Sequence, residues 1–271
     1  LTIMGVGSVT ALNEAIASGR SREVILVAEA LHERQLASIA RAIANRQPSS
    51  RLVAVSGPTS AGKTTFAKRL ALQVMAQGIY PVIISLDDYF VNREDTPRDA
   101  LGNFDFETLE AVDIVLFQDH MRRLMIGEEV VLPRYNFKTG LREEGAPLQI
   151  GKDHVILVEG IHGLNPRLTA SLPPSSTFRV FISAFTQLNL DKHNRVPTTD
   201  TRLLRRIVRD ASHRGYSAAQ TIARWNSVRR GEKNHIFPYQ NSADVFFNSA
   251  LVYELSALKL LAEPLLLQVE S

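Results

Sequence analysis

Apolar residues recur along this chain with two different spacings, and segments of the two kinds alternate. Short apolar runs, such as residues 52–55 and 155–158, have the length of buried strands. Longer segments place apolar residues three and four positions apart, as amphipathic helices do. Strands that alternate with helices are joined by right-handed crossovers and form a mostly parallel sheet. The pattern therefore predicts an α/β fold in which a mostly parallel sheet is flanked by helices.

The individual elements follow from these runs and from the residues that interrupt them. Strands are predicted at 52–56, 80–86, 129–132, 155–158, 178–183 and 243–247, and helices at 8–17, 22–46, 63–77, 108–126, 200–212, 217–229 and 252–262. Long loops, which are often functional, are expected at 86–104 and 134–151. The sequence Gln-Pro-Ser-Ser at 47–50 breaks the second helix. We therefore divide the chain into an N-terminal helical connector, residues 1–47, and a larger domain, residues 48–271.

Length and composition restrict the classes of protein. The chain has 271 residues, of which 45% are hydrophobic and 22% charged, as in globular proteins with a full core. No apolar run approaches the ~20 residues that span a membrane, so no membrane segment is expected. The absence of cysteine excludes disulfides and thiolate chemistry and is compatible with the cytoplasm, the location we expect. Whether the protein forms a homo-oligomer is left open by the sequence.

Positive charge is concentrated in one part of the chain. Eleven basic and three acidic residues lie between Lys192 and Lys233, a local excess of +8, whereas the whole chain carries +3. Such a field suits an anionic partner, either phosphate groups or nucleic acid. Arginine recurs here at helical spacing, and guanidinium groups bind phosphate bidentately, which favours phosphate. A solvated helix face is the alternative interpretation.

One segment matches a known phosphate-binding pattern. Residues 57–64 read Gly-Pro-Thr-Ser-Ala-Gly-Lys-Thr and fit the P-loop pattern G-x-x-x-x-G-K-[ST] between a predicted strand and a predicted helix. The glycines let backbone N–H groups turn toward phosphate, Lys63 adds charge at the β- and γ-phosphates, and Thr64 offers a hydroxyl to Mg²⁺. A glycine turn with an incidental lysine is the alternative. The pattern predicts ATP and Mg²⁺ as cofactors and a nucleotide site made of Gly57, Pro58, Thr59, Ser60, Ala61, Gly62, Lys63, Thr64 and Thr65.

Two acidic residues follow strands that we expect to end at the same edge of the sheet. Glu159 follows the buried run 155–158, where it would hold the metal together with Thr64. Asp87 follows the strand at 80–86, where a carboxylate could accept the proton of a hydroxyl that attacks the γ-phosphate. The sequence does not decide whether Asp87 or its neighbour Asp88 faces inward. A surface carboxylate at 159 and turn residues at 87 and 88 are the alternatives.

These segments, taken in their order, resemble the uridine kinase and phosphoribulokinase family. The resemblance covers about residues 51–262 and rests on residues 57–64, 85–90, 103–105, 133–137, 157–160 and 200–210. It implies a P-loop kinase with an arginine-rich lid helix. The enzyme would transfer the γ-phosphate of ATP to a hydroxyl of a small molecule, in the first place the 5′-OH of a nucleoside such as uridine.

Two other functions remain open at this point. A non-nucleoside sugar, polyol or other alcohol is the alternative acceptor. A nucleotide-dependent regulatory or RNA-associated binding module is the alternative of another class, but no aromatic RNA-binding motif accompanies the basic segment, so nucleic acid is not the expected partner.

The resemblance also implies roles for single residues. Lys63, Asp87 and Arg206 would be catalytic, with Asp87 as the base, and Arg205 and Arg209 would reach the ATP phosphates from the lid helix. The acceptor would be bound by Asp87, Tyr89, Asp105, Tyr135, Phe137 and Arg202.

The position after the aromatic segment sets this chain apart from typical uridine kinases. Those enzymes place a histidine that reads the pyrimidine after the aromatic segment, whereas this chain has Gly140 there. Weaker selectivity for uridine, or another acceptor, is therefore expected. The sequence is also similar to a bacterial branch of nucleoside kinases in which the kinase follows domains resembling threonyl-tRNA synthetase, and residues 1–47 would then connect the two parts.

Overall fold

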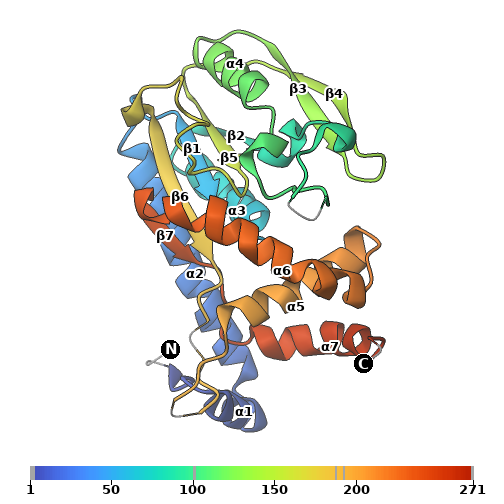
Figure 1. The fold of residues 1–271 in the computed structure, drawn as a ribbon. Coiled ribbons are helices and arrows are strands. Elements are labelled where there is room, and N and C mark those ends of the chain that lie inside the picture. The colour runs from blue at the N-terminus through green and yellow to red at the C-terminus, as the bar shows by residue number, and fades with distance from the viewer. Residues whose placement is uncertain (1–3, 100–101, 187, 192, 270–271) are drawn as a thin grey trace.

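A parallel five-stranded sheet forms the centre of the computed structural model, which describes residues 4–99, 102–186, 188–191 and 193–269 (Figure 1). The strand order is β2-β5-β1-β6-β7, and every pairing in this sheet is parallel. The strands are β1 (Leu52–Ser56), β2 (Tyr80–Ser85), β5 (His154–Glu159), β6 (Thr177–Ser183) and β7 (Val245–Asn248). The α/β fold with a mostly parallel sheet is thereby confirmed.

Helices cover both faces of the sheet. Because side chains alternate along a strand, Val53 and Val55 of β1 enter the core on one face, whereas Leu52 enters the core on the other. The first core is closed by α3 (Lys63–Met75) and by the second half of α2 (Ser21–Ala44). The second core is closed mainly by α4 (Ile114–Met125).

The N-terminal segment is tied to the rest of the molecule through α2. The helix α1 (Val9–Ala17) and the first half of α2 form a smaller apolar cluster that includes Leu12, Val24, Leu188 and Val252. Farther along α2, Leu36 is fully buried against α3 in the core of the sheet. The helix therefore contributes a layer to the sheet in addition to linking it with α1. The division of the chain near residue 48 stays a prediction.

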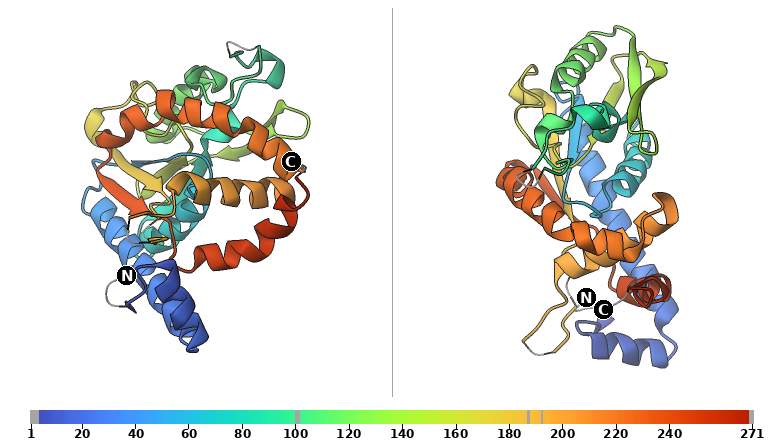
Figure 2. Two further views of the ribbon diagram at one scale, coloured as in Figure 1. Left: turned by 60° about the horizontal axis from the view of Figure 1, so that its bottom comes forward. Right: turned by 45° about the vertical axis from the view of Figure 1, so that its right-hand side comes forward.

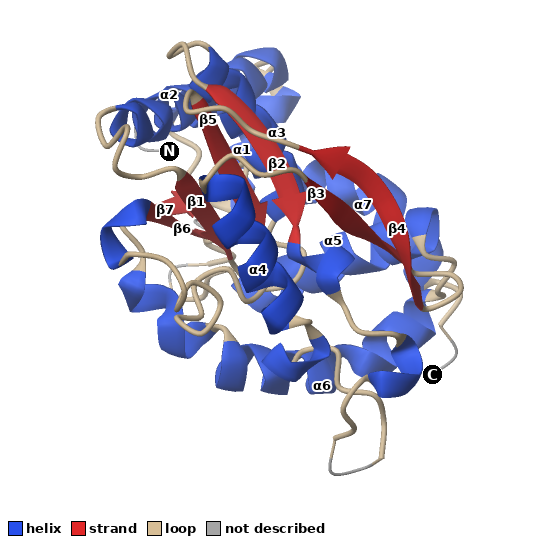
Figure 3. Cartoon of the chain, turned by 90° about the horizontal axis from the view of Figure 1, so that it is seen from above, coloured by secondary structure: helices blue, strands red, loops and turns tan. Residues whose placement is uncertain are grey.

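The part predicted as a loop at 134–151 is instead mostly strand. β3 (Val130–Asn136) and β4 (Leu141–Leu148) form an antiparallel hairpin at the side of the sheet (Figure 3). The loop prediction was wrong because β4 reads Leu-Arg-Glu-Glu-Gly-Ala-Pro-Leu and none of its residues is fully buried, so it has no apolar alternation. Its pairing with β3 also shifts register between Val131 and Pro133.

Three helices, α5 (Thr198–His213), α6 (Ala218–His235) and α7 (Glu254–Leu266), lie together on one side of the sheet (Figures 1 and 2). A capping box of Ser217 and Gln220 opens α6, which continues well past its predicted end. The helix predicted from residue 108 begins at Ile114 instead, since Asp113 caps it by accepting a hydrogen bond from the Leu116 N–H. Among the helices in the described part of the chain, none has both the length and the apolar character needed to cross a bilayer.

Candidate functional site

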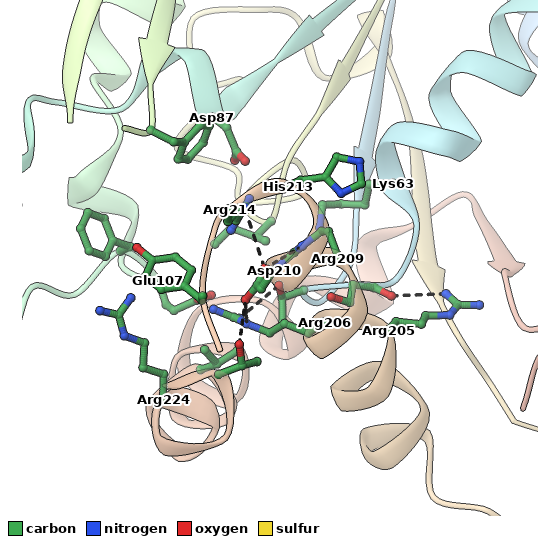
Figure 4. Close-up of a pocket in the computed structure, with 18 of the residues that line it drawn as sticks. Lys63, Asp87, Glu107, Arg205, Arg206, Arg209, Asp210, His213, Arg214 and Arg224 are labelled. Atoms are coloured by element: carbon green, nitrogen blue, oxygen red, sulfur yellow. Dashed lines mark hydrogen bonds and ion pairs between the residues drawn. The ribbon is translucent and has the colours of Figure 1, made fainter. Parts of the chain in front are cut away.

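A cavity of about 1720 Å³ opens beside the carboxyl ends of β1, β2 and β5. The P-loop, the turn after β2, the end of β3 and the helices α5 and α6 contribute its walls. Asp87 lies on one side of it, while Arg206 and Arg209 of α5 lie on the other (Figure 4). Ligands bind at this edge of open α/β sheets, so the cavity is the candidate site.

The P-loop has the backbone conformation that an anion site needs. Gly62 and the non-glycine Ser60 have φ angles of 88° and 56°, in the left-handed region that turns successive N–H groups to one side. Gly57 is required for a different reason, because a Cβ there would come within 2.1 Å of the Ile182 carbonyl oxygen. Lys63 donates hydrogen bonds of 3.0 and 3.3 Å to the carbonyl oxygens of Gly57 and Pro58.

The predicted nucleotide residues divide into two groups. The cavity is lined by Thr59, Ser60, Gly62, Lys63, Thr64 and Thr65. Gly57, Pro58 and Ala61 are buried and do not line the cavity. These three residues support the shape of the loop.

The two predicted metal ligands meet in the structure. The Thr64 hydroxyl donates to Glu159 Oε1 at 2.8 Å, and the Ser85 hydroxyl donates to the same oxygen at 3.3 Å. Burial raises the pKa of Glu159, as does the neighbouring negative charge of Asp87, while Lys63 opposes both. One carboxylate and one hydroxyl fit Mg²⁺, which takes oxygen ligands and completes its shell with phosphates and water. No cluster of three or more acidic or histidine side chains suited to a metal occurs in the described ranges.

The structure separates the two adjacent aspartates. Asp87 lines the cavity. Asp88 is half-buried, and its Oδ1 accepts a hydrogen bond of 3.2 Å from the Tyr135 N–H on β3. Burial raises the pKa of Asp88. Of the pair, Asp87 is therefore the carboxylate that an acceptor in the cavity can reach.

Three arginines surround one buried carboxylate at the cavity wall. Asp210 accepts from Arg206 Nε at 3.2 Å and from Arg209 Nη2 at 2.7 Å, and Arg214 Nε lies 4.0 Å away (Figure 4). Burial lowers the pKa of Arg214, and the positive charge of Arg209 lowers it further. Since one carboxylate faces three guanidinium groups, this wall presents net positive charge to a ligand.

Arg202 does not reach the acceptor side, and its predicted role there was wrong. Its side chain is 2% exposed and lies outside the cavity lining. Arg202 Nη2 donates to Glu232 Oε2 of α6 at 2.8 Å, and Nη1 donates to the Thr59 carbonyl oxygen at 3.2 Å. Glu232 in turn accepts from the Thr59 N–H at 3.0 Å. The pair therefore fastens the P-loop to α5 and α6.

Arg205 lines the cavity, but its charge is already balanced. It donates to Glu254 Oε2 at 2.7 Å and to the Ser249 carbonyl oxygen at 2.9 Å. A third hydrogen bond of 3.3 Å reaches the Ser60 carbonyl oxygen. Arg206 and Arg209 are therefore better placed than Arg205 to meet phosphate.

Tyr89 is the second predicted acceptor residue that the structure moves elsewhere. It is fully buried, packs edge-to-face on Phe117, and its hydroxyl lies 3.0 Å from His120 Nδ1. The 3₁₀ turn Leu86–Tyr89 directs this ring into the core, so the predicted contact with the acceptor was wrong.

The remaining predicted acceptor residues, Asp105, Tyr135 and Phe137, line the cavity. The Tyr135 and Phe137 rings meet edge-to-face, with centroids 5.1 Å apart. The guanidinium of Arg214 stands 5.1 Å from the Phe137 centroid. Phe137 and Arg214 therefore present an aromatic and cationic surface to the cavity, with the buried Tyr135 ring behind Phe137.

Glu107 and Arg93 are among the cavity residues that sequence reasoning missed. Burial raises the pKa of Glu107 to about 7, although Arg206 opposes the shift. Arg93 donates to the Phe137 carbonyl oxygen at 2.8 Å and packs on Gly140, where a Cβ would come within 2.7 Å of Arg93 Nε. Glu107 follows Asp105 by two positions, a signal that could have been used. Arg93 lies in a segment with no pattern that distinguishes it.

Comparison with known proteins agrees with this architecture. Residues 52–256 match the phosphoribulokinase/uridine kinase family. The chain is 28% identical over 195 residues to uridine-cytidine kinase B of Dictyostelium discoideum, covering 72% of each chain. It is 27% identical over 195 residues to a uridine kinase of Halobacterium salinarum, covering 71% of this chain and 77% of that one. The structure resembles that of a protein described as a putative fructose transport system kinase from Silicibacter sp. TM1040. The TM-score is 0.53 at 21% identity, with coverage of 78% of this chain and 98% of that one.

Proposed function

The chain belongs to the phosphoribulokinase/uridine kinase family, and on this basis we propose that it is an ATP- and Mg²⁺-dependent kinase for the 5′-hydroxyl of a nucleoside. The two relatives are described as a uridine-cytidine kinase and a uridine kinase, which supports a nucleoside as the acceptor. We place the reaction in the cytoplasm, with a small molecule as the only partner that the reaction requires.

One observation carries the proposal. A single cavity is lined both by Lys63 and Thr64 of the P-loop and by Asp87, which follows the edge strand β2. A protein that only binds or switches on a nucleotide needs no carboxylate facing the reacting phosphate. A kinase needs such a carboxylate, because phosphoryl transfer requires an oriented hydroxyl whose proton is accepted as the new bond forms.

Each of these cavity residues has its own role in phosphoryl transfer. The acceptor oxygen forms a bond to the γ-phosphorus, the bond between that phosphorus and the β–γ bridging oxygen breaks, and the acceptor proton passes to Asp87. Lys63, Arg206 and Arg209 stabilise the negative charge on the transferring group and on the leaving ADP. Thr64 and Glu159 would hold Mg²⁺, which neutralises phosphate charge when bound.

The acceptor surface supports a ring-shaped substrate. Phe137 offers an exposed apolar ring in the cavity, and the buried Tyr135 ring packs against it. Asp105 lies in the same cavity to accept hydrogen bonds from sugar hydroxyls. Stacking on aromatic rings tolerates any base, which agrees with the absence of a side chain at Gly140. A sugar or polyol without a base would leave the aromatic pair unused, and this observation favours the nucleoside.

A screen of acceptors tests the proposal. Purified protein is given ATP, Mg²⁺ and one nucleoside, sugar or polyol at a time, and acceptor-dependent release of ADP is measured. We expect release with at least one nucleoside and its loss in Lys63→Ala, because removing a charge from the phosphate site costs about 10²-fold or more. Nucleotide binding without release of ADP for any acceptor would favour a regulatory module instead.

We propose that domains resembling threonyl-tRNA synthetase precede this kinase in a longer protein. The resemblance of the sequence is the only support for this, and the upstream coding sequence tests it.

A further inference from the structure

The cavity continues beyond the phosphate site into a pocket that the reaction steps above do not use. From Thr65 it follows α3 to Phe66 and Arg69 and reaches His32 of α2. The segment after β7 supplies Ser249 and Leu251 on another side. Ser249 also adjoins the P-loop, since a Cβ built on Gly62 would lie 3.9 Å from the Ser249 side chain. We call this part of the cavity the α2 pocket.

The charges of the α2 pocket are balanced, in contrast to the arginine cluster around Asp210. Arg69 donates to Glu29 at 3.1 Å and to Glu33 at 2.6 Å, both on α2. Arg205 is likewise paired with Glu254. Since each of these guanidinium groups already faces carboxylate, the pocket offers no excess positive charge for a second phosphate group.

The pocket instead offers what a flat heterocycle requires. The Phe247 ring lies on its floor and meets the His32 ring edge-to-face, with centroids 5.2 Å apart. Burial lowers the pKa of His32, and the charge of Arg69 lowers it further, which favours the neutral imidazole. A neutral imidazole has one N–H donor and one nitrogen acceptor. The backbone of Ala250 is hydrogen-bonded to one ring nitrogen of His32, which leaves the other for the polar edge of a base.

We propose that the α2 pocket binds the purine base of the phosphate donor and that His32 contacts the edge of that base. The inference rests on the proposed function and extends it, because it places the recognition of the donor base on a helix that precedes the family match at residues 52–256. The hydrogen bonds from Arg69 to Glu29 and Glu33, together with the 2.7 Å bond from the Tyr253 hydroxyl to Glu29, hold α2 in this place.

Comparing ADP with inorganic tripolyphosphate isolates the contribution of the base. Isothermal titration measures the binding of both probes, with Mg²⁺, to the full chain and to His32→Ala. We expect His32→Ala to weaken ADP binding by about 5–10-fold, as for one lost hydrogen bond with its packing. Tripolyphosphate binding should stay within about twofold, because the phosphate site is unchanged. Ser38→Ala, at an exposed position of the same helix, is the matched control and should alter neither probe.

A second variant tests whether His32 reads the edge of the base. His32→Phe keeps a ring against Phe247 but removes both nitrogens, so the ratio of ADP to GDP affinity should change while tripolyphosphate binding does not. The inference would be overturned if His32→Ala weakened the binding of ADP and of tripolyphosphate equally, or if it weakened neither. A wild-type protein that binds neither probe would overturn the proposed function itself, which makes the two failures distinguishable.

Discussion

The hydroxyl of Thr64 donates a hydrogen bond of 2.8 Å to Oε1 of Glu159 and so joins the first turn of α3 to the last residue of β5. The two residues are 95 positions apart in the chain. They meet because β1, which leads into the P-loop, is paired in parallel with β5. Adjacent parallel strands bring their carboxyl ends to one edge, and we propose that the pair holds the metal there.

Replacing the carboxylate of this pair tests the metal site. Glu159→Gln keeps the size of the side chain but removes its charge, so Mg²⁺ should be held more weakly. We expect the Mg²⁺ concentration that gives half-maximal rate to rise by about 10-fold or more. The measurement is initial rate against Mg²⁺ at saturating ATP. Thr64→Ser retains a hydroxyl and should show a much smaller shift, and an unchanged Mg²⁺ dependence in Glu159→Gln would contradict the assignment.

Exchanging the cavity aspartate for its amide tests the base. Asp87→Asn should lower turnover by about 10²–10⁴-fold and leave ADP affinity nearly unchanged, since it removes the proton acceptor and not the phosphate site. Steady-state kinetics and ADP titration measure the two effects. Asp88→Asn is the control, because Asp88 binds the Tyr135 N–H on β3 and should mainly affect stability. A severe loss of turnover in Asp88→Asn with a mild one in Asp87→Asn would reverse their roles.

Two arginines one helical turn apart on α5 should behave differently. Arg202→Ala leaves Glu232 buried without its partner and should lower the free energy of unfolding by about 3–5 kcal/mol. Arg206→Ala should lower turnover with a smaller effect on stability, because its side chain reaches the cavity. Urea unfolding and steady-state kinetics on both variants separate the effects. Wild-type turnover in Arg206→Ala would contradict a catalytic contribution of Arg206.

Selectivity among nucleosides should be modest. Gly140 has no side chain to read a base, and Arg142 is held by Asp113 at 2.8 Å, away from the cavity. We therefore expect kcat/KM for uridine to exceed the values for cytidine and a purine nucleoside by less than about 10³-fold. A larger preference would show that a dedicated reader exists. Lys138 lines the cavity, so loss of such a preference in Lys138→Ala would identify the reader.

The raised pKa of Glu107 predicts a pH dependence of stability. Its pKa of about 7 in the folded state lies above the ordinary 4.5, so the folded protein binds the proton more tightly than the unfolded chain does. Stability should therefore fall as pH rises from about 4.5 to about 7. Glu107→Gln cannot ionise, so its melting temperature should exceed that of the wild type at pH 8, and the difference should shrink toward pH 5.

Glu110 provides a control of opposite sign for this measurement. Its hydrogen bonds from Thr108 and Arg167 lower its pKa to about 2, so its ionised form favours the folded state at neutral pH. Glu110→Gln should therefore be slightly less stable than the wild type at pH 8. Thermal unfolding of both variants without nucleotide at pH 5 and pH 8 checks the signs, and a Glu107→Gln protein less stable than the wild type at pH 8 would contradict the prediction.

The sequence by itself determined the class of fold and the position of the P-loop. A buried parallel strand is a continuous apolar run, and a P-loop is a contiguous pattern in which strand, glycine turn and helix follow one another, so both are local in the chain. The strand β1 was predicted with the bounds that the structure has, and Thr64 and Glu159 were predicted as partners because both were expected at one edge of the sheet. The polar β4 was missed because an exposed strand leaves no apolar alternation.

Only the tertiary structure decided what each side chain faces. Helical spacing puts Arg202, Arg205, Arg206 and Arg209 on one side of α5, but it cannot tell that Glu232 of α6 buries the first and Glu254 pairs with the second. Likewise, a 3₁₀ turn sends Tyr89 into the core and leaves Asp87 at the cavity. The position of His32 in the α2 pocket depends on how α2 packs on α3 and on the segment after β7. Local pattern fixes the backbone of an element, whereas the environment of a side chain is set by elements distant in the chain that pack against it.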